Sequence, residues 1–123
     1  PPINFDVSLP QADIGRFAQA IQADFDARWP GHHTLFFGHV GDGNLHVSTD
    51  GATVHGECDA VEAALYAQVA RFHGSVSAEH GIGLHKKPFL HASRTPPELA
   101  AMRAIKAALD PLNLMNPGKV FDL

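Results

Sequence analysis

The segment FFGHVGDGNLHVS, residues 36–48, contains a turn between two runs of strand-forming residues. Asp42 and Gly43 are typical of a two-residue hairpin loop, because glycine adopts a positive φ without strain and aspartate tolerates one. With these two residues as the loop, His39 lies opposite His46 in the antiparallel ladder. Directly opposed residues have Cβ atoms about 4.5–5.5 Å apart on the same face of the sheet. The hairpin therefore predicts two imidazoles able to bind one metal ion.

Hydrophobic spacing predicts further elements on both sides of this hairpin. Residues 3–9 alternate apolar with polar side chains, which is the period of a half-buried strand. Residues 11–28 and 57–73 have apolar side chains every three or four positions, the period of an amphipathic helix. Gly74 is expected to terminate the second of these helices. The stretch SVSAEHG, residues 75–81, predicts a fourth short strand that leads into a glycine-rich loop.

A third helix is expected to begin after Thr95. This residue can cap the helix, Pro96 suits its first position, and Glu98 completes a capping box. The apolar side chains that this helix is expected to turn inward are Leu99, Met102, Ile105 and Leu109.

The order of these elements predicts an α+β fold of the ferredoxin-like, split βαβ type. Its antiparallel sheet would carry helices on one face and would be followed by a C-terminal helix and tail. The other face of the sheet is left for another partner. The chain has 123 residues, 45% of them hydrophobic, which is enough for one compact core, so we expect one domain over residues 1–123.

The composition excludes some classes of partner. Nine basic and 13 acidic residues give a formal charge of −4, which argues against binding to nucleic acid or an anionic membrane surface. No apolar run in the sequence approaches the roughly 18 residues of a membrane-spanning helix. The single cysteine, Cys58, excludes an intrachain disulfide and favours a reducing compartment, so we expect a cytoplasmic location. The initial PP, without Met, suggests a piece of a longer chain.

The stretch SAEHGIG, residues 77–83, is the best source of a third metal ligand. Glu79 and His80 are adjacent at an expected strand end, so one side chain can bind a metal while the other faces a substrate. A carboxylate with two imidazoles suits zinc, iron, nickel or manganese and leaves open positions on the ion, as catalytic sites do.

Plainer structural roles account for the same residues. Paired histidines can hydrogen-bond backbone groups, and a glutamate and a capping histidine can precede a tight turn without binding anything. Lys86 and Lys87 could neutralise an anionic substrate or cofactor, or they could lie in solvent. The residues alone leave these alternatives open.

Four segments occur in the order FDVSLP, GHVGDGNLH, AEHGIGLHKK and LDPLNLMNPGKVF, and with them the chain resembles the C-terminal region of the FAD-linked oxidase family. These flavoenzymes oxidise glycolate, D-lactate or D-2-hydroxyglutarate and share a flavin domain of the vanillyl-alcohol-oxidase type. The segments span nearly the whole chain, and the second and third together are highly specific. The resemblance implies an FAD-binding domain before residue 1, so the isolated chain is expected to be inactive.

The resemblance also implies roles for individual residues. The residues matching His39, His46 and Glu79 bind a divalent metal, here expected to be zinc or manganese. The residue matching His80 is the general base for the substrate hydroxyl, while FAD accepts hydride, and Asn116 is the expected cofactor contact. The expected partners are a small 2-hydroxy acid, the chain's own N-terminal FAD domain and an unidentified electron acceptor. Subunit association, a homodimer included, is left open.

Two positions depart from the pattern of the branch that oxidises D-2-hydroxyglutarate. The resemblance implies a lysine two residues before the aspartate of FDVSLP and an asparagine two residues after the second metal-binding histidine, both in contact with substrate. This chain has Asn4 and Ser48 at those positions. Without the lysine a distal carboxylate loses its partner, so a smaller acid such as lactate or glycolate is expected.

Two other functions use the same residues. A stand-alone metal-dependent hydrolase would activate water with His39, His46 and Glu79 and would need no flavin. A regulatory module would have kept the fold and lost the chemistry. The four ordered segments and the uncovered face of the predicted sheet favour the flavoenzyme.

Overall fold

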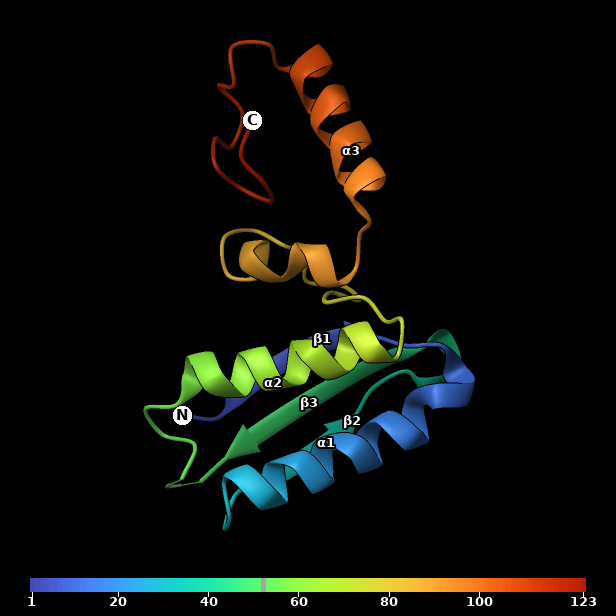
Figure 1. Cartoon of the computed structure of the whole chain (residues 1–123), viewed down its shortest axis with the longest axis vertical. Coiled ribbons are helices and arrows are strands. Elements are labelled where there is room, and N and C mark those ends of the chain that lie inside the picture. The colour runs from blue at the N-terminus through green and yellow to red at the C-terminus, as the bar shows by residue number, and fades with distance from the viewer. Residues whose placement is uncertain (52) are drawn as a thin grey trace.

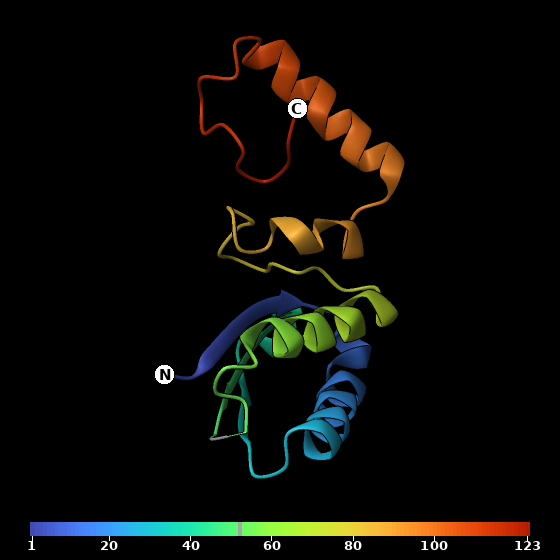
Figure 2. The ribbon, with the colours of Figure 1, turned by 60° about the vertical axis from the view of Figure 1, so that its left-hand side comes forward.

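The computed structural model describes residues 1–51 and 53–123. Its elements are, in chain order, β1 (Ile3–Ser8), η1 (Gln11–Asp13), α1 (Ile14–Arg28), β2 (His33–Phe37), η2 (Val40–Asp42), β3 (Asn44–Asp50), α2 (Cys58–Arg71), η3 (Lys87–Ala92) and α3 (Pro96–Leu109). Within these residues the sheet is antiparallel with the strand order β1-β3-β2, and α1 and α2 lie over one of its faces (Figures 1 and 2). The predicted α+β fold is confirmed.

One hydrophobic core lies between the sheet and its two helices. All the residues expected on the inner stripe of α1 are buried, as are most of those expected on α2, and alternate residues of β1 and β3 complete the core. Burial of a side chain of this size contributes about 1.5–3 kcal/mol, so the apolar stripes stabilise the helices against the sheet. The core includes Phe5, Val7, Ile14, Phe17, Ile21, Phe25, Leu45, Val47, Val61, Leu65 and Val69.

The hairpin between β2 and β3 does not have the predicted register. Phe37 lies opposite His46, and β2 ends at Phe37. His39 therefore lies in the connecting loop and not in the ladder. The prediction that the two histidines face each other across the strands is wrong.

Two glycines explain the longer loop. Gly38 adopts a φ of 142°, and a Cβ atom at this position would lie 2.6 Å from the carbonyl oxygen of Asn44. The chain can leave the ladder there because glycine has no side chain. The 3₁₀ turn η2 follows and ends at Gly43, whose φ is 75°. The Asp-Gly pair thus marks the end of the turn, but Gly38 sets where β2 ends and therefore the length of the loop.

The predicted fourth strand is reduced, in the described residues, to a single bridge. Ser8 and Ser75 exchange two backbone hydrogen bonds of 3.0 and 2.8 Å at the end of β1. The amides of residues 78–80 donate instead to a side chain, the carboxylate of Asp6. An N–H group that donates to this carboxylate cannot donate to a neighbouring strand, so the strand stops after the bridge.

The end of α2 also differs from the prediction. The residue with a left-handed conformation is His73, whose φ is 55°, and not Gly74. Gly74 is needed for another reason, because a Cβ atom there would lie 2.5 Å from the carbonyl oxygen of Ser8. This glycine allows the chain to approach β1 where the bridge forms.

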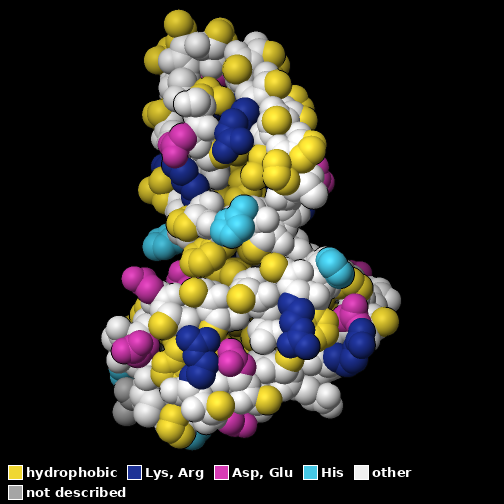
Figure 3. All heavy atoms as spheres, in the orientation of Figure 1, with side chains coloured by type: hydrophobic (Ala, Val, Ile, Leu, Met, Phe, Trp, Pro, Cys, Tyr) yellow, Lys and Arg dark blue, Asp and Glu magenta, His cyan; other side chains and the backbone are white. Residues whose placement is uncertain are grey.

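The third helix, α3, begins as predicted but does not pack as predicted. Thr95 and Glu98 form the expected capping box. Ile105 and Leu109 are 61% and 79% exposed, and α3 buries none of its residues against the described part of the chain. Figures 1 and 2 show this helix and the tail after it on the far side of η3 from the sheet. Hydrophobic side chains lie on the surface of this part of the molecule (Figure 3). Leu99 and Met102 are half-buried, so the expectation of an inward stripe is wrong for Ile105 and Leu109. Periodicity identifies an apolar face but not what covers it.

Replacing Gly38 with alanine is expected to lower the free energy of unfolding by about 1–3 kcal/mol, because a side chain there would be strained and would meet the Asn44 oxygen. Gly41→Ala is a matched control from the same loop, since no described atom lies within 4 Å of its Cβ position. Urea denaturation measures both variants. Equal stabilities would contradict the observed register.

Candidate active site

The face of the sheet opposite the helices carries the polar residues of β1 and β3. Asp6 lies directly opposite His46, and Asn4 lies directly opposite Ser48. Because side chains alternate along a strand, all four point to the face that the helices do not cover. The sheet therefore places His46 beside the two residues, Asn4 and Ser48, that were predicted to contact the substrate.

Asp6 holds the segment that carries Glu79 and His80. Its side chain is 1% exposed. Its carboxylate accepts hydrogen bonds from the Ser77 hydroxyl at 3.1 Å and from the N–H groups of Ala78, Glu79 and His80 at 3.2, 3.0 and 2.8 Å. Successive N–H groups directed at one anion form a backbone nest. The nest fixes two predicted site residues against β1.

Lys86 balances the charge of Asp6. Its Nζ donates to the main-chain oxygen of Asp6 at 2.9 Å and lies 3.3 Å from Oδ2. Burial raises the pKa of the Asp6 carboxyl, but the N–H groups of His80 and Glu79 and the Lys86 ammonium outweigh burial and hold this pKa well below its usual value. Lys86 therefore forms an internal ion pair and does not lie in solvent.

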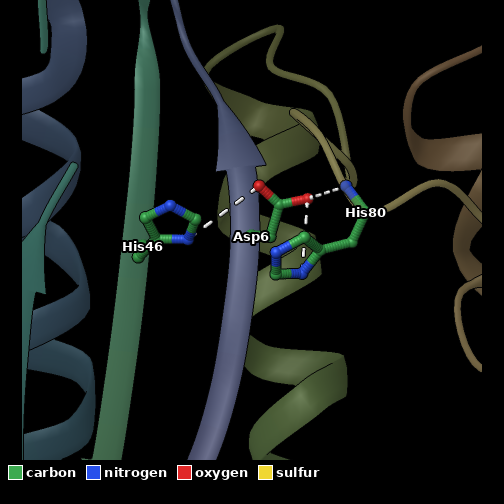
Figure 4. Close-up of side chains that lie close together, drawn as sticks. All are labelled: Asp6, His46 and His80. Atoms are coloured by element: carbon green, nitrogen blue, oxygen red, sulfur yellow. Dashed lines mark hydrogen bonds and ion pairs between the residues drawn. The ribbon is translucent and has the colours of Figure 1, made fainter. Parts of the chain in front are cut away.

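The side chains of His46, Glu79 and His80 gather above Asp6, and Figure 4 shows both histidine rings beside its carboxylate. Nδ1 of His46 lies 4.0 Å from Asp6 Oδ1, and Nδ1 of His80 lies 3.8 Å from Asp6 Oδ2. Nε2 of His46 lies 3.9 Å from Glu79 Oε2. The two rings are stacked, with centroids 5.8 Å apart. The structure thus brings three of the predicted site residues together.

A pocket of about 390 Å³ adjoins this cluster. Asn4, Phe37, His46 and His80 line it, together with one core residue each of β1 and β3. The Phe37 ring lies 5.2 Å from the ring of His46, centroid to centroid. Small-molecule sites combine such apolar walls with a few polar groups that orient the ligand.

His39 and Asn116 lie outside the cluster. Among the described residues, the potential metal ligands whose donor atoms all lie within 4.8 Å of one another are Asp6, His46 and His80. His39 is exposed in the loop before η2. Asn116 is exposed in the tail after α3, with a φ of 49°. A metal-binding role for His39 and a cofactor contact for Asn116 stay predictions.

His46 and Glu79 have donor atoms that fit one divalent ion. Zinc bonds to imidazole nitrogen or carboxylate oxygen are about 2.0–2.2 Å long, so two such atoms on one ion lie at most about 4.4 Å apart. The 3.9 Å between His46 Nε2 and Glu79 Oε2 meets this limit. Asp6 is less suited to bind the ion, because Lys86 and the loop N–H groups already occupy its carboxylate.

No sequence pattern identified Asp6 as part of the site, and for Lys86 the sequence left open a role toward an anionic ligand or a place in solvent, not a pair with Asp6. Both lie in segments that carry the family resemblance, but they are separated by 80 residues in the sequence. The strand period was the one signal for Asp6, since it places this residue on the face away from the core. No local pattern marks Lys86, because its partner is distant in the chain.

Comparison with known proteins agrees with the four segments. The family model "FAD linked oxidases, C-terminal domain" matches residues 1–120. The chain belongs to this family. This FAD-linked oxidase domain is 42% identical, over 98% of its length, to a D-2-hydroxyglutarate dehydrogenase of Xanthomonas citri pv. viticola. It is 36% identical, over 94% of its length, to the glycolate oxidase subunit GlcD of Bacillus subtilis.

The FAD-linked oxidase domain corresponds to only part of these relatives. It covers 27% of the Xanthomonas protein and 25% of GlcD, so the chain spans about a quarter of the length of the curated relatives it matches. A D-2-hydroxyglutarate dehydrogenase of Stutzerimonas stutzeri is similar, with 37% identity over 98% of this chain and 27% of the relative. In residues 1–51 and 53–123, no helix has the length and apolar character needed to cross a membrane.

Acid is expected to destabilise this FAD-linked oxidase domain partly through Asp6. Folding holds the Asp6 pKa below that of the unfolded chain, about 3.9, so the carboxylate stabilises the fold above that pH. This stabilisation is lost as the pH falls through the lower, folded-state pKa. Between pH about 5 and about 2, the free energy of unfolding should therefore fall less in Asp6→Asn than in the wild type. Equal losses in urea denaturation would contradict the prediction.

Proposed function

We propose that this chain is the substrate- and metal-binding domain of an FAD-dependent 2-hydroxy acid dehydrogenase or oxidase. The observation that carries the proposal is the cluster of His46, Glu79 and His80, which adjoins a pocket of about 390 Å³ on the open face of the sheet. Family membership supports the flavin chemistry. The names of the relatives, D-2-hydroxyglutarate dehydrogenase and glycolate oxidase, support a 2-hydroxy acid as substrate.

His39, His46 and Glu79 would hold a divalent ion, zinc or manganese. The 3.9 Å contact between His46 and Glu79 supports this set, and His39 lies in the loop that leads into the strand of His46. When bound, the ion supplies a Lewis acid that favours ionisation of a hydroxyl group.

His80 would take the proton of the substrate hydroxyl at Nε2. Nδ1 of this ring lies 3.8 Å from the buried carboxylate of Asp6, so Nε2 is the nitrogen left for the substrate. The His80 side chain is 66% exposed and lines the pocket, and a small acid can therefore reach it. FAD, when bound, would supply the hydride acceptor for this oxidation.

Asn4 and Ser48 would contact the substrate beside His46. Asn4 lines the pocket, and Ser48 is its cross-strand partner. Neither side chain is cationic, which favours lactate or glycolate over an acid with a second carboxylate. Six relatives are named D-2-hydroxyglutarate dehydrogenase, so activity on smaller acids should be compared with activity on that larger acid.

An N-terminal FAD domain would cover the open face of the sheet. Leu35 and Phe37 of β2 are 67% and 56% exposed, and both belong to the face that carries His46. The relatives have about three quarters of their length outside the match, which leaves room for such a domain. The electron acceptor, a homodimer and a cytoplasmic location stay predictions, and the name of the Bos taurus relative includes the word mitochondrial.

Metal binding by the purified chain tests the first half of the proposal. We expect the wild type to bind one Zn²⁺ ion, and His46→Ala to bind it at least about 100-fold more weakly, because a ligand is lost. Titration calorimetry measures both. His55→Ala is a matched control, since His55 pairs with Asp50 at 2.8 Å away from the cluster. Equal affinity of the wild type and His46→Ala would contradict the metal site.

Turnover tests the second half, in the longer flavoprotein that the proposal implies. His80→Gln should lower kcat for its 2-hydroxy acid by about 10²–10⁴-fold, the usual contribution of a general base, and leave FAD bound. His33→Gln is the control, because His33 is an exposed residue of β2 outside the pocket. D-lactate, glycolate and D-2-hydroxyglutarate are compared with an artificial electron acceptor. An unchanged kcat in His80→Gln contradicts the role of His80, and ester hydrolysis by the flavin-free chain would favour the hydrolase.

A further inference from the structure

One buried carboxylate faces two histidine rings that have different proposed tasks. Asp6 Oδ1 lies 4.0 Å from Nδ1 of His46, and Asp6 Oδ2 lies 3.8 Å from Nδ1 of His80 (Figure 4). In both rings the nitrogen that faces Asp6 is therefore Nδ1. The Nε2 atom of His46 lies 3.9 Å from Glu79 Oε2, on the side of the proposed metal ion.

We propose that Asp6 is a positioning residue that sets the orientation and tautomer of both His46 and His80. A carboxylate can only accept hydrogen bonds, so a neutral imidazole beside it is favoured with its proton on the nitrogen that faces the carboxylate. Asp6 thereby keeps the proton on Nδ1 of each ring. Nε2 of His46 is left with its lone pair for a metal ion, and Nε2 of His80 is left with its lone pair to accept the substrate proton. This inference rests on the proposed function, because it assigns a role toward the same site.

Metal-binding histidines commonly direct their second ring nitrogen at a carboxylate, which raises the basicity of the coordinating nitrogen. His46 has this arrangement, because its Nδ1 faces Asp6 and its Nε2 faces Glu79. The distances of 4.0 and 3.8 Å exceed a hydrogen bond, so in this structure Asp6 acts on the rings through its charge.

The surroundings of Asp6 suit a positioning residue better than a metal ligand. Oδ2 accepts hydrogen bonds from the Ser77 hydroxyl and the His80 amide. The Lys86 ammonium lies 3.3 Å from the same oxygen. The ammonium beside Oδ2 repels a second cation at the same oxygen. Oδ1 has the weaker contacts and is the atom directed at His46.

The same carboxylate also sets the backbone that carries the other two site residues. The amides of Glu79 and His80 donate to Asp6 at 3.0 and 2.8 Å. Asp6 itself lies in register opposite His46. Asp6 therefore contacts the strand of His46 and the backbone of Glu79 and His80. A change at Asp6 should alter the positions of all three side chains together.

Nitrogen-15 NMR of the metal-free wild-type chain tests the proposal without a substitution. The spectra are recorded at pH about 8.5, above the usual histidine pKa of about 6.5. We expect His46 and His80 to carry the proton on Nδ1. The Nε2–H form, which predominates for histidine free in water, would overturn the proposal if either ring adopted it.

Zinc titration of Asp6→Asn gives a second readout. The loss of a carboxylate behind a ligand is expected to weaken zinc binding by about 10–100-fold, with the helix content by circular dichroism retained. Asp50→Asn is the matched control, because Asp50 also faces a histidine, His55, at 2.8 Å but lies outside the site. Its zinc affinity should stay within about twofold of the wild type, well short of the loss expected behind a ligand.

The outcomes separate this inference from the proposed function. Wild-type affinity in Asp6→Asn would overturn the positioning role. A loss well above about 100-fold that equals the loss in His46→Ala would also overturn it, because Asp6 would then be a ligand. If Asp6→Asn does not fold, the nitrogen-15 NMR measurement of the tautomers in the wild type decides whether Asp6 has the positioning role. If the wild type binds no zinc, the metal site of the proposed function fails, while the Nδ1–H result still supports or overturns the role of Asp6.

Discussion

The ion pair and nest around Asp6 are the interactions on which the candidate site depends. An isolated carboxylate is costly to bury, and here three backbone amides, a hydroxyl and the Lys86 ammonium offset that cost. The partners lie 71 to 80 residues from Asp6 in the sequence. The same contacts end the fourth strand after one bridge and turn the chain across the open face of the sheet. Without them nothing in the local sequence would hold Glu79 and His80 beside His46.

The two faces of the sheet differ in what they pack against. One face packs against α1 and α2 and forms the hydrophobic core, so its residues are constrained by packing. The other face carries Asn4, His46 and Ser48 together with exposed apolar residues of β2. Strand alternation makes this division possible, because each neighbouring residue points to the opposite side. The side chains of Asn4, His46 and Ser48 therefore lie outside the packing of the hydrophobic core.

The candidate site was predictable where the sequence pattern is local and not where it depends on distant contacts. The hairpin motif and the Glu-His pair identified His46, Glu79 and His80, and the structure brings these three together. The register of the hairpin was wrong because Gly38 ends β2 earlier than the Asp-Gly turn suggests. The prediction that Ile105 and Leu109 of α3 pack inward was wrong, because an amphipathic pattern does not show which surface will cover the apolar face.

The sequence by itself determined the α+β class, the inner stripes of α1 and α2, the capping box of α3 and the membership in the FAD-linked oxidase family. These follow from short-range periodicity, capping chemistry and motif order, all of which are written within a few residues. Only the tertiary structure decided the hairpin register, the loss of the fourth strand and the burial of Asp6 with Lys86. Each of these depends on a close backbone approach or on a charge pair between distant segments, and neither leaves a periodic trace in the sequence.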